Sequence, residues 1–227
     1  GSPTVCSETC VGRIRYLGVM LYDADKIQEA ASVEGEQELY DAQLGVFLDP
    51  NDPEVQAAAR EEGVPEAWIK SAIESPVWKM AMDWKIAFPL HPEYRTLPMV
   101  WYIPPLSPIQ NAAEAGAIGT DAGMPDVKNL RIPVKYLANM LTAGDEEPVV
   151  TALERMLAMR SYMRSKTIEG VVDEAIAARV GLSGRVIEDM YKIMALADYE
   201  DRFVIPTTHR EQVEEAYDLR GGCGFTD

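Results

Sequence analysis

Two of the three cysteines in the 227-residue sequence lie close together near its start, and their type and spacing suit metal chemistry. Cys6 and Cys10 are separated by three residues, and thiolates bind both zinc and iron–sulfur clusters. A zinc knuckle needs a second ligand pair, and the only histidines, His91 and His209, have no partner near them in sequence. A cubane iron–sulfur cluster takes four thiolates, so its other cysteines would have to lie outside the given sequence.

The spacing of the pair also occurs at the end of ferredoxin-type cysteine runs, in which the last cysteine binds a different cluster from the one before it. Cys6 and Cys10 fit that spacing, although Val11 stands where proline commonly follows. The interpretation is that both are iron–sulfur ligands. Alone, the pair is a weak motif, for which ordinary free thiols are the simpler explanation.

The segment that contains the pair is slightly basic, whereas the chain as a whole is acidic. Gly12 allows an unusual backbone turn, and Arg13 and Arg15 would stabilise anionic clusters and raise their reduction potential. Residues 1–22 have a net charge of +1, whereas the whole chain has a net charge of −16. An acidic body of this kind argues against binding to nucleic acid or anionic lipid. The sequence contains no apolar run long enough for a membrane helix and begins with no signal segment.

The hydrophobic pattern predicts a mainly α fold with short β segments (α+β). Strands or extended pieces are predicted over 13–22, 99–103 and 203–206. Helices are predicted over 26–32, 36–47, from 53, from 65, and over 77–86, 133–141, 146–166, 173–180, 185–199 and 210–216. Residues 111–125 are expected to form a surface loop, and Cys223, in a Gly-rich tail, to be a free thiol.

Residues 49–54 (DPNDPE) resemble the start of a calcium loop but fail its requirements. If Asp49 were the first ligand, Pro53 would occupy the fifth position, where a side-chain oxygen is needed. Glu54 would replace the glycine at which such a loop turns. The same letters fit a helix start, with Asp52 as the N-cap and Pro53 at the first helical position.

Residues 89–108 contain six prolines, which disfavour a helix and favour an extended strap. Such a rigid segment costs little entropy to order, so it would suit a docking surface for another protein. It would equally suit an internal strap over the chain's own core. The sequence leaves both interpretations open.

Longer stretches of sequence are more specific than the cysteine pair. The chain closely resembles the β subunit of respiratory nitrate reductase over essentially its whole length, with the β subunit of nitrite oxidoreductase, in which electrons flow in the reverse direction, as a close relative. The resemblance lies in CSETCVGRIRYLGVMLYDAD, FLDPNDPEV, SPVWKMAM, FPLHPEYRTLPMVWYIPPLSPIQ, LRIPVKYLANMLTAGD, YEDRFVIPTTHRE and GCGF.

The resemblance implies an electron-transfer subunit with three [4Fe–4S] clusters and one [3Fe–4S] cluster. Such a subunit relays electrons from a membrane haem-b γ subunit to a molybdenum catalytic α subunit that reduces nitrate to nitrite. It is held on the cytoplasmic face of the membrane by its partners and has no catalytic centre of its own. Cys6 and Cys10 match ligands of two different [4Fe–4S] clusters, and the family's other cluster cysteines lie upstream, so no cluster is complete in this chain.

Two segments follow from this resemblance. Residues 1–22 would be the trailing edge of a ferredoxin-like iron–sulfur domain, and residues 23–227 a mostly helical C-terminal region that includes the proline-rich strap. A subunit-assembly module without its own redox role is the alternative function. A hydrolase has no support, because the sequence contains no nucleophile elbow, phosphate loop or H-E-x-x-H motif.

Overall fold

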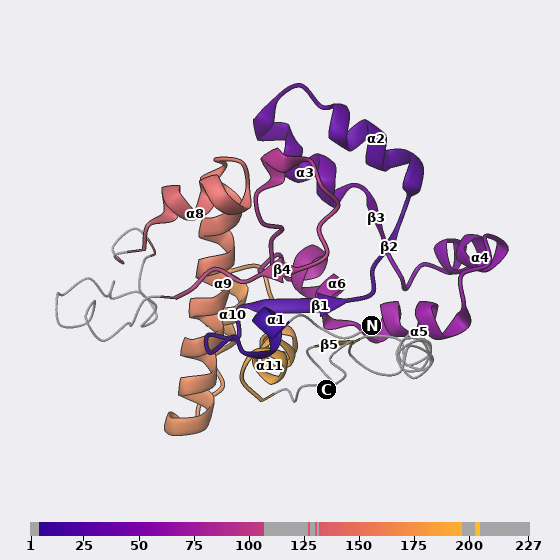
Figure 1. Cartoon of the computed structure of the whole chain (residues 1–227). Helices are drawn as coiled ribbons and strands as arrows, with labels where there is room; N and C mark the ends of the chain where they lie inside the picture. Colours follow the sequence, from indigo (N-terminus) through magenta and orange to yellow (C-terminus); the bar gives the residue numbers. More distant parts are fainter. Residues whose placement is uncertain (1–4, 107–126, 128–129, 131, 197–202, 205–227) are drawn as a thin grey trace, which may run out of the picture.

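The computed structural model describes residues 5–106, 127, 130, 132–196 and 203–204 and confirms a mainly α fold with short strands (Figure 1). The α-helices are α1 (Val5–Glu8), α2 (Ala24–Ser32), α3 (Leu39–Leu44), α4 (Pro53–Glu61), α5 (Glu66–Glu74), α6 (Pro76–Trp78), α8 (Val134–Leu141), α9 (Glu146–Arg164), α10 (Glu174–Arg179) and α11 (Gly184–Tyr191). Tighter 3₁₀ turns are η1 (Glu36–Glu38) and η3 (Pro92–Tyr94), and wider π turns are η2 (Lys79–Asp83), η5 (Ser165–Glu169) and η6 (Lys192–Leu196). The strands are β1 (Arg15–Gly18), β2 (Leu21–Tyr22), β3 (Phe47–Leu48), β4 (Trp101–Tyr102) and β5 (Phe203–Val204).

Strand β1 is the centre of a three-stranded sheet of order β4-β1-β5. It pairs antiparallel with β4, with Tyr16 opposite Trp101, and parallel with β5, with Leu17 opposite Phe203. β2 pairs with β3 in a separate two-stranded sheet. The single strand predicted over 13–22 is therefore two strands, which belong to different sheets.

Three aspartates cap helices, and the cap predicted at Asp52 is confirmed. Asp23, Asp52 and Asp145 each accept a hydrogen bond from the backbone N–H two residues on, at 3.0, 2.8 and 3.0 Å. These bonds satisfy N–H groups that the first turn of a helix leaves unpaired. The cap at Asp52 also accounts for the DPNDPE stretch, as the sequence indicates.

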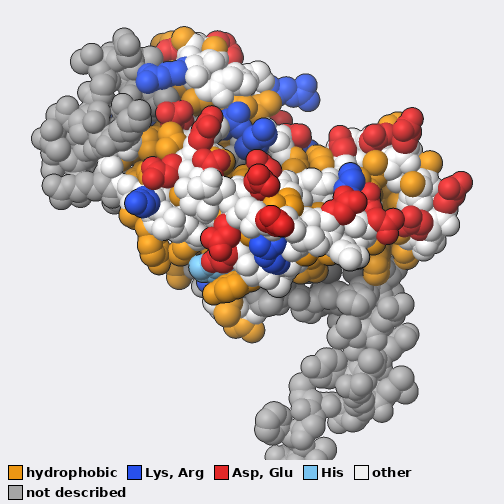
Figure 2. Space-filling view, turned by 90° about the horizontal axis from the view of Figure 1, so that it is seen from above, with side chains coloured by type: hydrophobic (Ala, Val, Ile, Leu, Met, Phe, Trp, Pro, Cys, Tyr) orange, Lys and Arg blue, Asp and Glu red, His pale blue; other side chains and the backbone are white. Residues whose placement is uncertain are grey.

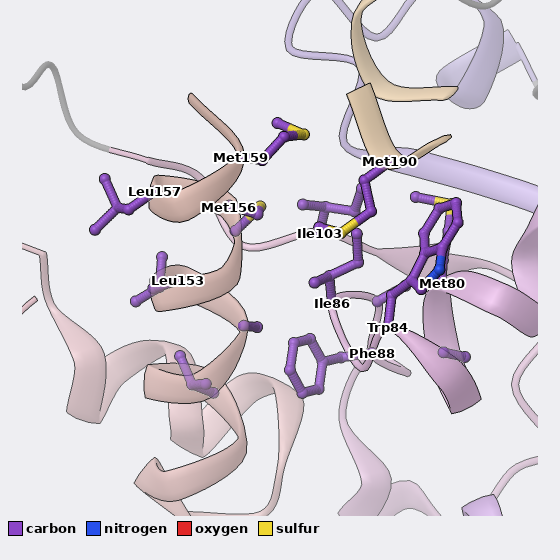
Figure 3. Close-up of a cluster of buried hydrophobic side chains, with 14 of the residues drawn as sticks. Met80, Trp84, Ile86, Phe88, Ile103, Leu153, Met156, Leu157, Met159 and Met190 are labelled. Atoms are coloured by element: carbon purple, nitrogen blue, oxygen red, sulfur yellow. The ribbon is translucent and has the colours of Figure 1, made fainter. Parts of the chain in front are cut away.

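Helix α9 contributes many of the buried side chains of the main hydrophobic core. α8 packs near its N-terminal end, and α10 and α11 pack along its other end (Figure 1). In Figure 3, Met156 and Met159 lie on the side of this helix that faces Ile86 and Phe88, and Leu153 and Leu157 lie on its other side. The labelled residues of this cluster are Met80, Trp84, Ile86, Phe88, Ile103, Leu153, Met156, Leu157, Met159 and Met190. Four methionines, Met80, Met156, Met159 and Met190, help to fill this core.

The proline-rich strap is internal over part of its length. Trp101 and Ile103 are buried in the main core, which confirms the internal interpretation for this part. Leu90, Tyr94 and Met99 are exposed, so their side of the strap is open to solvent. The docking interpretation stays a prediction for that part.

Two predicted helices end early. The helix predicted over 36–47 consists of η1 and α3 and ends at Leu44. Phe47 instead lies in β3, where it pairs with Tyr22 of β2. The helix predicted over 77–86 ends at Asp83 after the π turn, and Ile86 lies beyond it. At Phe47 the pairing with another strand outweighs local helical spacing. At the second helix the end is local, because Lys85 has a φ of +47° and the N–H of Ile86 donates to the carbonyl of Met80 at 2.8 Å.

The predicted helix 185–199 is α11 followed by η6 as far as Leu196, and the rest lies outside the described residues. So do the predicted loop 111–125, the predicted helix 210–216 and Cys223. The extended piece at 203–206 is confirmed as β5 for its first two residues.

The surface reflects the acidic composition. In Figure 2, Asp and Glu side chains outnumber Lys and Arg on the face shown. Within the described part of the chain, no helix combines the length and the apolar character needed to cross a bilayer.

Candidate metal centre

Cys6 and Cys10 lie in two consecutive turns of backbone. Cys6 is in α1, and Cys10 follows the end of that helix. The first turn is closed by Thr9, whose N–H and hydroxyl both donate to the carbonyl of Val5, at 2.9 and 2.7 Å. The second is closed by the N–H of Arg13, which donates to the carbonyl of Cys10 at 3.0 Å. The cysteine segment, residues 5–13, therefore has a hydrogen-bonded backbone although its helix is only four residues long.

The unusual backbone turn lies one residue later than expected. Arg13 has a φ of +50°, in the left-handed region, whereas Gly12 has no positive φ. This conformation costs a residue with a side chain about 1–2 kcal/mol. The cost is offset at the next residue, where the carbonyl of Ile14 accepts the N–H of Ile103 at 2.9 Å and so joins the turn to the strap.

Arg15 joins the cysteine segment to the sheet. Its Nη1 donates to the carbonyl of Cys6 at 2.6 Å, and its Cζ lies 5.9 Å from the centroid of the Tyr102 ring. Arg15 and Tyr102 are opposite each other in the β1–β4 pair. In Figure 1, α1 accordingly lies beside the start of β1. Ser7 in this segment and Tyr16 in β1 are both buried, with 1% of each residue exposed.

The thiols face outward from this support. Cys6 is exposed, Cys10 is half-buried, and neither forms a disulfide. Val5 and Val11, the apolar residues beside them, are 69% and 100% exposed. Within the described ranges, no group of three or more His, Cys, Asp or Glu residues is arranged to hold a metal ion. The pair can therefore supply only part of a metal centre.

A second polar cluster, absent from the predictions, lies between α9, α10 and α11. The hydroxyl of the buried Tyr162 is 3.3 Å from Glu174 Oε1 and 3.4 Å from Glu188 Oε1. Lys166 pairs with Glu188, and Glu174 accepts the N–H of Gly184 at 3.1 Å. Burial, and then the charge of Glu174, raise the pKa of Tyr162. The cluster joins α9, α10 and α11 through side-chain contacts.

Known proteins match this chain along its whole length. The chain is 62% identical over 226 residues to the respiratory nitrate reductase 1 beta chain of Escherichia coli (strain K12), which covers 100% of this chain and 44% of that protein. It is 57% identical over 228 residues to the nitrate reductase beta chain of Bacillus subtilis (strain 168), with coverage of 100% and 47%. A family model described as "Respiratory nitrate reductase beta C-terminal" matches residues 106–184. The chain belongs to the respiratory nitrate reductase beta chain family.

The chain thus spans less than half the length of these two members of the nitrate reductase beta chain family. A Bradyrhizobium member is 46% identical over 211 residues, with coverage of 92% of this chain and 62% of that protein. The residues matched by the family model include α8, α9 and α10, and they do not include the cysteine segment. The assignment of Cys6 and Cys10 as cluster ligands therefore stays a prediction.

The cysteine segment fits one part of an iron–sulfur site in a nitrate reductase beta chain. Its donors are two thiols with accessible side chains and a hydrogen-bonded backbone, and two arginines lie within five residues of Cys10. Four thiolates are needed for a cubane, so these two cysteines alone do not complete one. Sequence reasoning found the cysteines and the two arginines. It missed the bond from Arg15 to Cys6, because a bond to a backbone carbonyl leaves no residue pattern.

Proposed function

We propose that the chain is the C-terminal part of the electron-transfer subunit of a respiratory nitrate reductase. In the complete complex, this subunit relays electrons from a membrane haem-b subunit to a molybdenum subunit that reduces nitrate to nitrite. The complete subunit holds [4Fe–4S] clusters and one [3Fe–4S] cluster. It lies on the cytoplasmic face of the membrane, bound through its partners.

The observation that carries this proposal is the 57–63% identity to nitrate reductase beta chains across the full length of the chain. Identity at this level over more than 220 residues includes the cysteine segment as well as the helical part. The arrangement of the cysteines supports the same function. Their thiols are accessible and their backbone is tied to β1, as a ligand pair at the edge of a larger cluster domain would require.

The residues of this chain have three roles in the proposal. The thiolates of Cys6 and Cys10 bind iron of two different [4Fe–4S] clusters, which when bound supply one-electron carriers. The positive charges of Arg13 and Arg15 favour the electron-rich form and raise its potential. The apolar surface at Val5 and Val11 is covered by the upstream part of the longer protein, which keeps water away from the thiolates.

The test uses the full-length subunit in its complex, with Cys6→Ser and Cys10→Ser as separate variants. Each substitution should alter or abolish the low-temperature EPR signal of a different [4Fe–4S] cluster and lower the content of iron and acid-labile sulfide. Cys223→Ser is the matched control, because that cysteine is expected to be a free thiol, and its spectrum should be unchanged.

The outcome separates this proposal from the assembly module. If both variants assemble with the catalytic subunit and show an unaltered EPR spectrum and iron content, the cysteines have no redox role. The chain would then serve only to hold subunits together. Loss of one distinct signal in each variant supports the electron-transfer function and the assignment to two clusters.

A further inference from the structure

Arg15 makes contacts that a charge-tuning residue alone would not need. Its Nη1 reaches back nine positions in sequence to the carbonyl of Cys6, at 2.6 Å. The guanidinium also lies over the ring of Tyr102, with 5.9 Å between Cζ and the ring centroid. A hydrogen bond from a charged donor is among the stronger ones in proteins, and a planar guanidinium can make it while resting on an aromatic ring.

The backbone that carries the Tyr102 ring is fixed by two hydrogen bonds, and the ring packs against the main core. The N–H of Tyr102 donates to the carbonyl of Phe88 at 2.7 Å, and the N–H of Phe88 donates back to Tyr102 at 2.9 Å. The side chain of Phe88 is fully buried, and so is that of Trp101 beside Tyr102. Contacts therefore run without a break from the main core, through Tyr102 and Arg15, to the backbone of Cys6.

One nitrogen of the Arg15 guanidinium group, Nε, is buried without a hydrogen-bond partner among the described residues, which is energetically unfavourable. The other contacts of the side chain must therefore determine its position. Arg13 differs, because its side chain is exposed and forms no hydrogen bond or ion pair with the residues that the structure describes.

We propose that Arg15 is a positioning residue for the cluster ligand Cys6, which it holds by its backbone carbonyl on the platform formed by Tyr102. This inference rests on the proposed function. A ligand must be held within about 0.5 Å and 10–20° of its productive geometry, and a turn of four helical residues does not achieve this alone. The strap supplies the missing rigidity, which gives its buried part a role at the metal centre.

The test compares Arg15→Met with Arg13→Met in the full-length subunit within its complex. Both substitutions remove one positive charge near the cysteines, but only Arg15→Met removes the bond to Cys6. Loss of an outer residue that orients a metal ligand typically weakens metal binding by about 10- to 100-fold. We expect Arg15→Met to speed iron release to a chelator by about that factor, and Arg13→Met to leave the release rate near that of the unsubstituted protein.

Two further readouts separate positioning from charge. Arg15→Lys keeps the charge but not the planar group, so it should release iron faster than the unsubstituted protein and more slowly than Arg15→Met. Arg15→Met should also broaden the EPR signal that Cys6→Ser alters. Equal release rates and unchanged line shapes in Arg15→Met and Arg13→Met would overturn the inference.

If Arg15→Met does not accumulate as folded protein, Tyr102→Leu takes its place. This substitution removes the platform and keeps both arginines, so faster iron release supports positioning and an unchanged rate contradicts it. The two proposals also fail differently. If Cys6→Ser leaves every cluster signal unchanged, the proposed function is wrong, whereas a response to Cys6→Ser without one to Arg15 or Tyr102 substitution refutes the positioning role alone.

Discussion

Replacing Gly18 with alanine should test how closely β1 is packed against the helical part of the chain. A Cβ atom on Gly18 would lie 2.0 Å from Ser75 Oγ, 2.9 Å from Val77 Cγ2 and 3.1 Å from Ser75 Cβ. Ser75 and Val77 are both buried, so neither can move into solvent. The hydroxyl of Ser75 can rotate away only by giving up the N–H of Val77, from which it accepts the capping bond of α6 at 3.3 Å.

The expected cost combines two effects. Overpacking a buried site costs about 1–3 kcal/mol, and loss of a helix cap costs about 1 kcal/mol. Gly18→Ala should therefore lower the free energy of unfolding by about 2–4 kcal/mol. The assay is urea unfolding followed by tryptophan fluorescence and circular dichroism. Gly12→Ala is the control, because its nearest neighbour would be at 3.5 Å, and it should change stability by less than about 0.5 kcal/mol.

A double-mutant cycle identifies the clashing atom. Ser75→Ala removes the hydroxyl oxygen and with it the shortest contact of the new methyl group. In that background Gly18→Ala should cost at least about 1 kcal/mol less than it does alone. A cost below about 0.5 kcal/mol for Gly18→Ala, or the same cost in both backgrounds, would refute the packing argument.

Two other predictions follow from buried side chains. Burial, followed by the charges of Asp41 and Asp145, raises the pKa of Tyr40 above the ordinary value of 10.0. The neutral side chain of Tyr40 therefore stabilises the fold fully below pH 10.0, and this contribution is lost as the pH rises beyond 10.0. Tyr40→Phe should flatten the decline of the urea midpoint above that pH, and an unaltered decline would contradict this reasoning. Leu153→Ala, at a fully buried position of α9, should lower stability by about 3 kcal/mol in a thermal melt. Leu90→Ala, at an exposed position, should cost less than about 1 kcal/mol; similar costs for the two variants would contradict the assigned core.

Local signals made the helices predictable. Asp23, Asp52 and Asp145 cap helices through bonds that span two residues, so the sequence around each contains all the relevant information. The strands were harder to predict. Phe47 fits helical spacing with its neighbours, but its partner in the sheet is Tyr22, which local spacing cannot reveal.

The candidate site was predictable only in its chemistry. Cysteine type and spacing indicate metal binding, and the resemblance indicates which metal centre. The support of Cys6 depends on Arg15 and Tyr102, which are 87 residues apart in sequence and meet only because β1 pairs with β4. The positive φ at Arg13 rather than Gly12 was equally hidden, since glycine accepts that conformation more readily.

Because β1 is the central strand, its sheet can be completed only late in the synthesis of the protein. Its partner Trp101 follows Tyr16 by 85 residues, and its partner Phe203 follows Leu17 by 186. At about 5–20 residues per second, a ribosome needs roughly 10–40 s to reach the second partner after the first strand has left it. During this interval the cysteine segment is attached to an unfinished sheet. Metal insertion that waits for the complete chain would meet a rigid pair of thiols, whereas earlier insertion would meet a loose one.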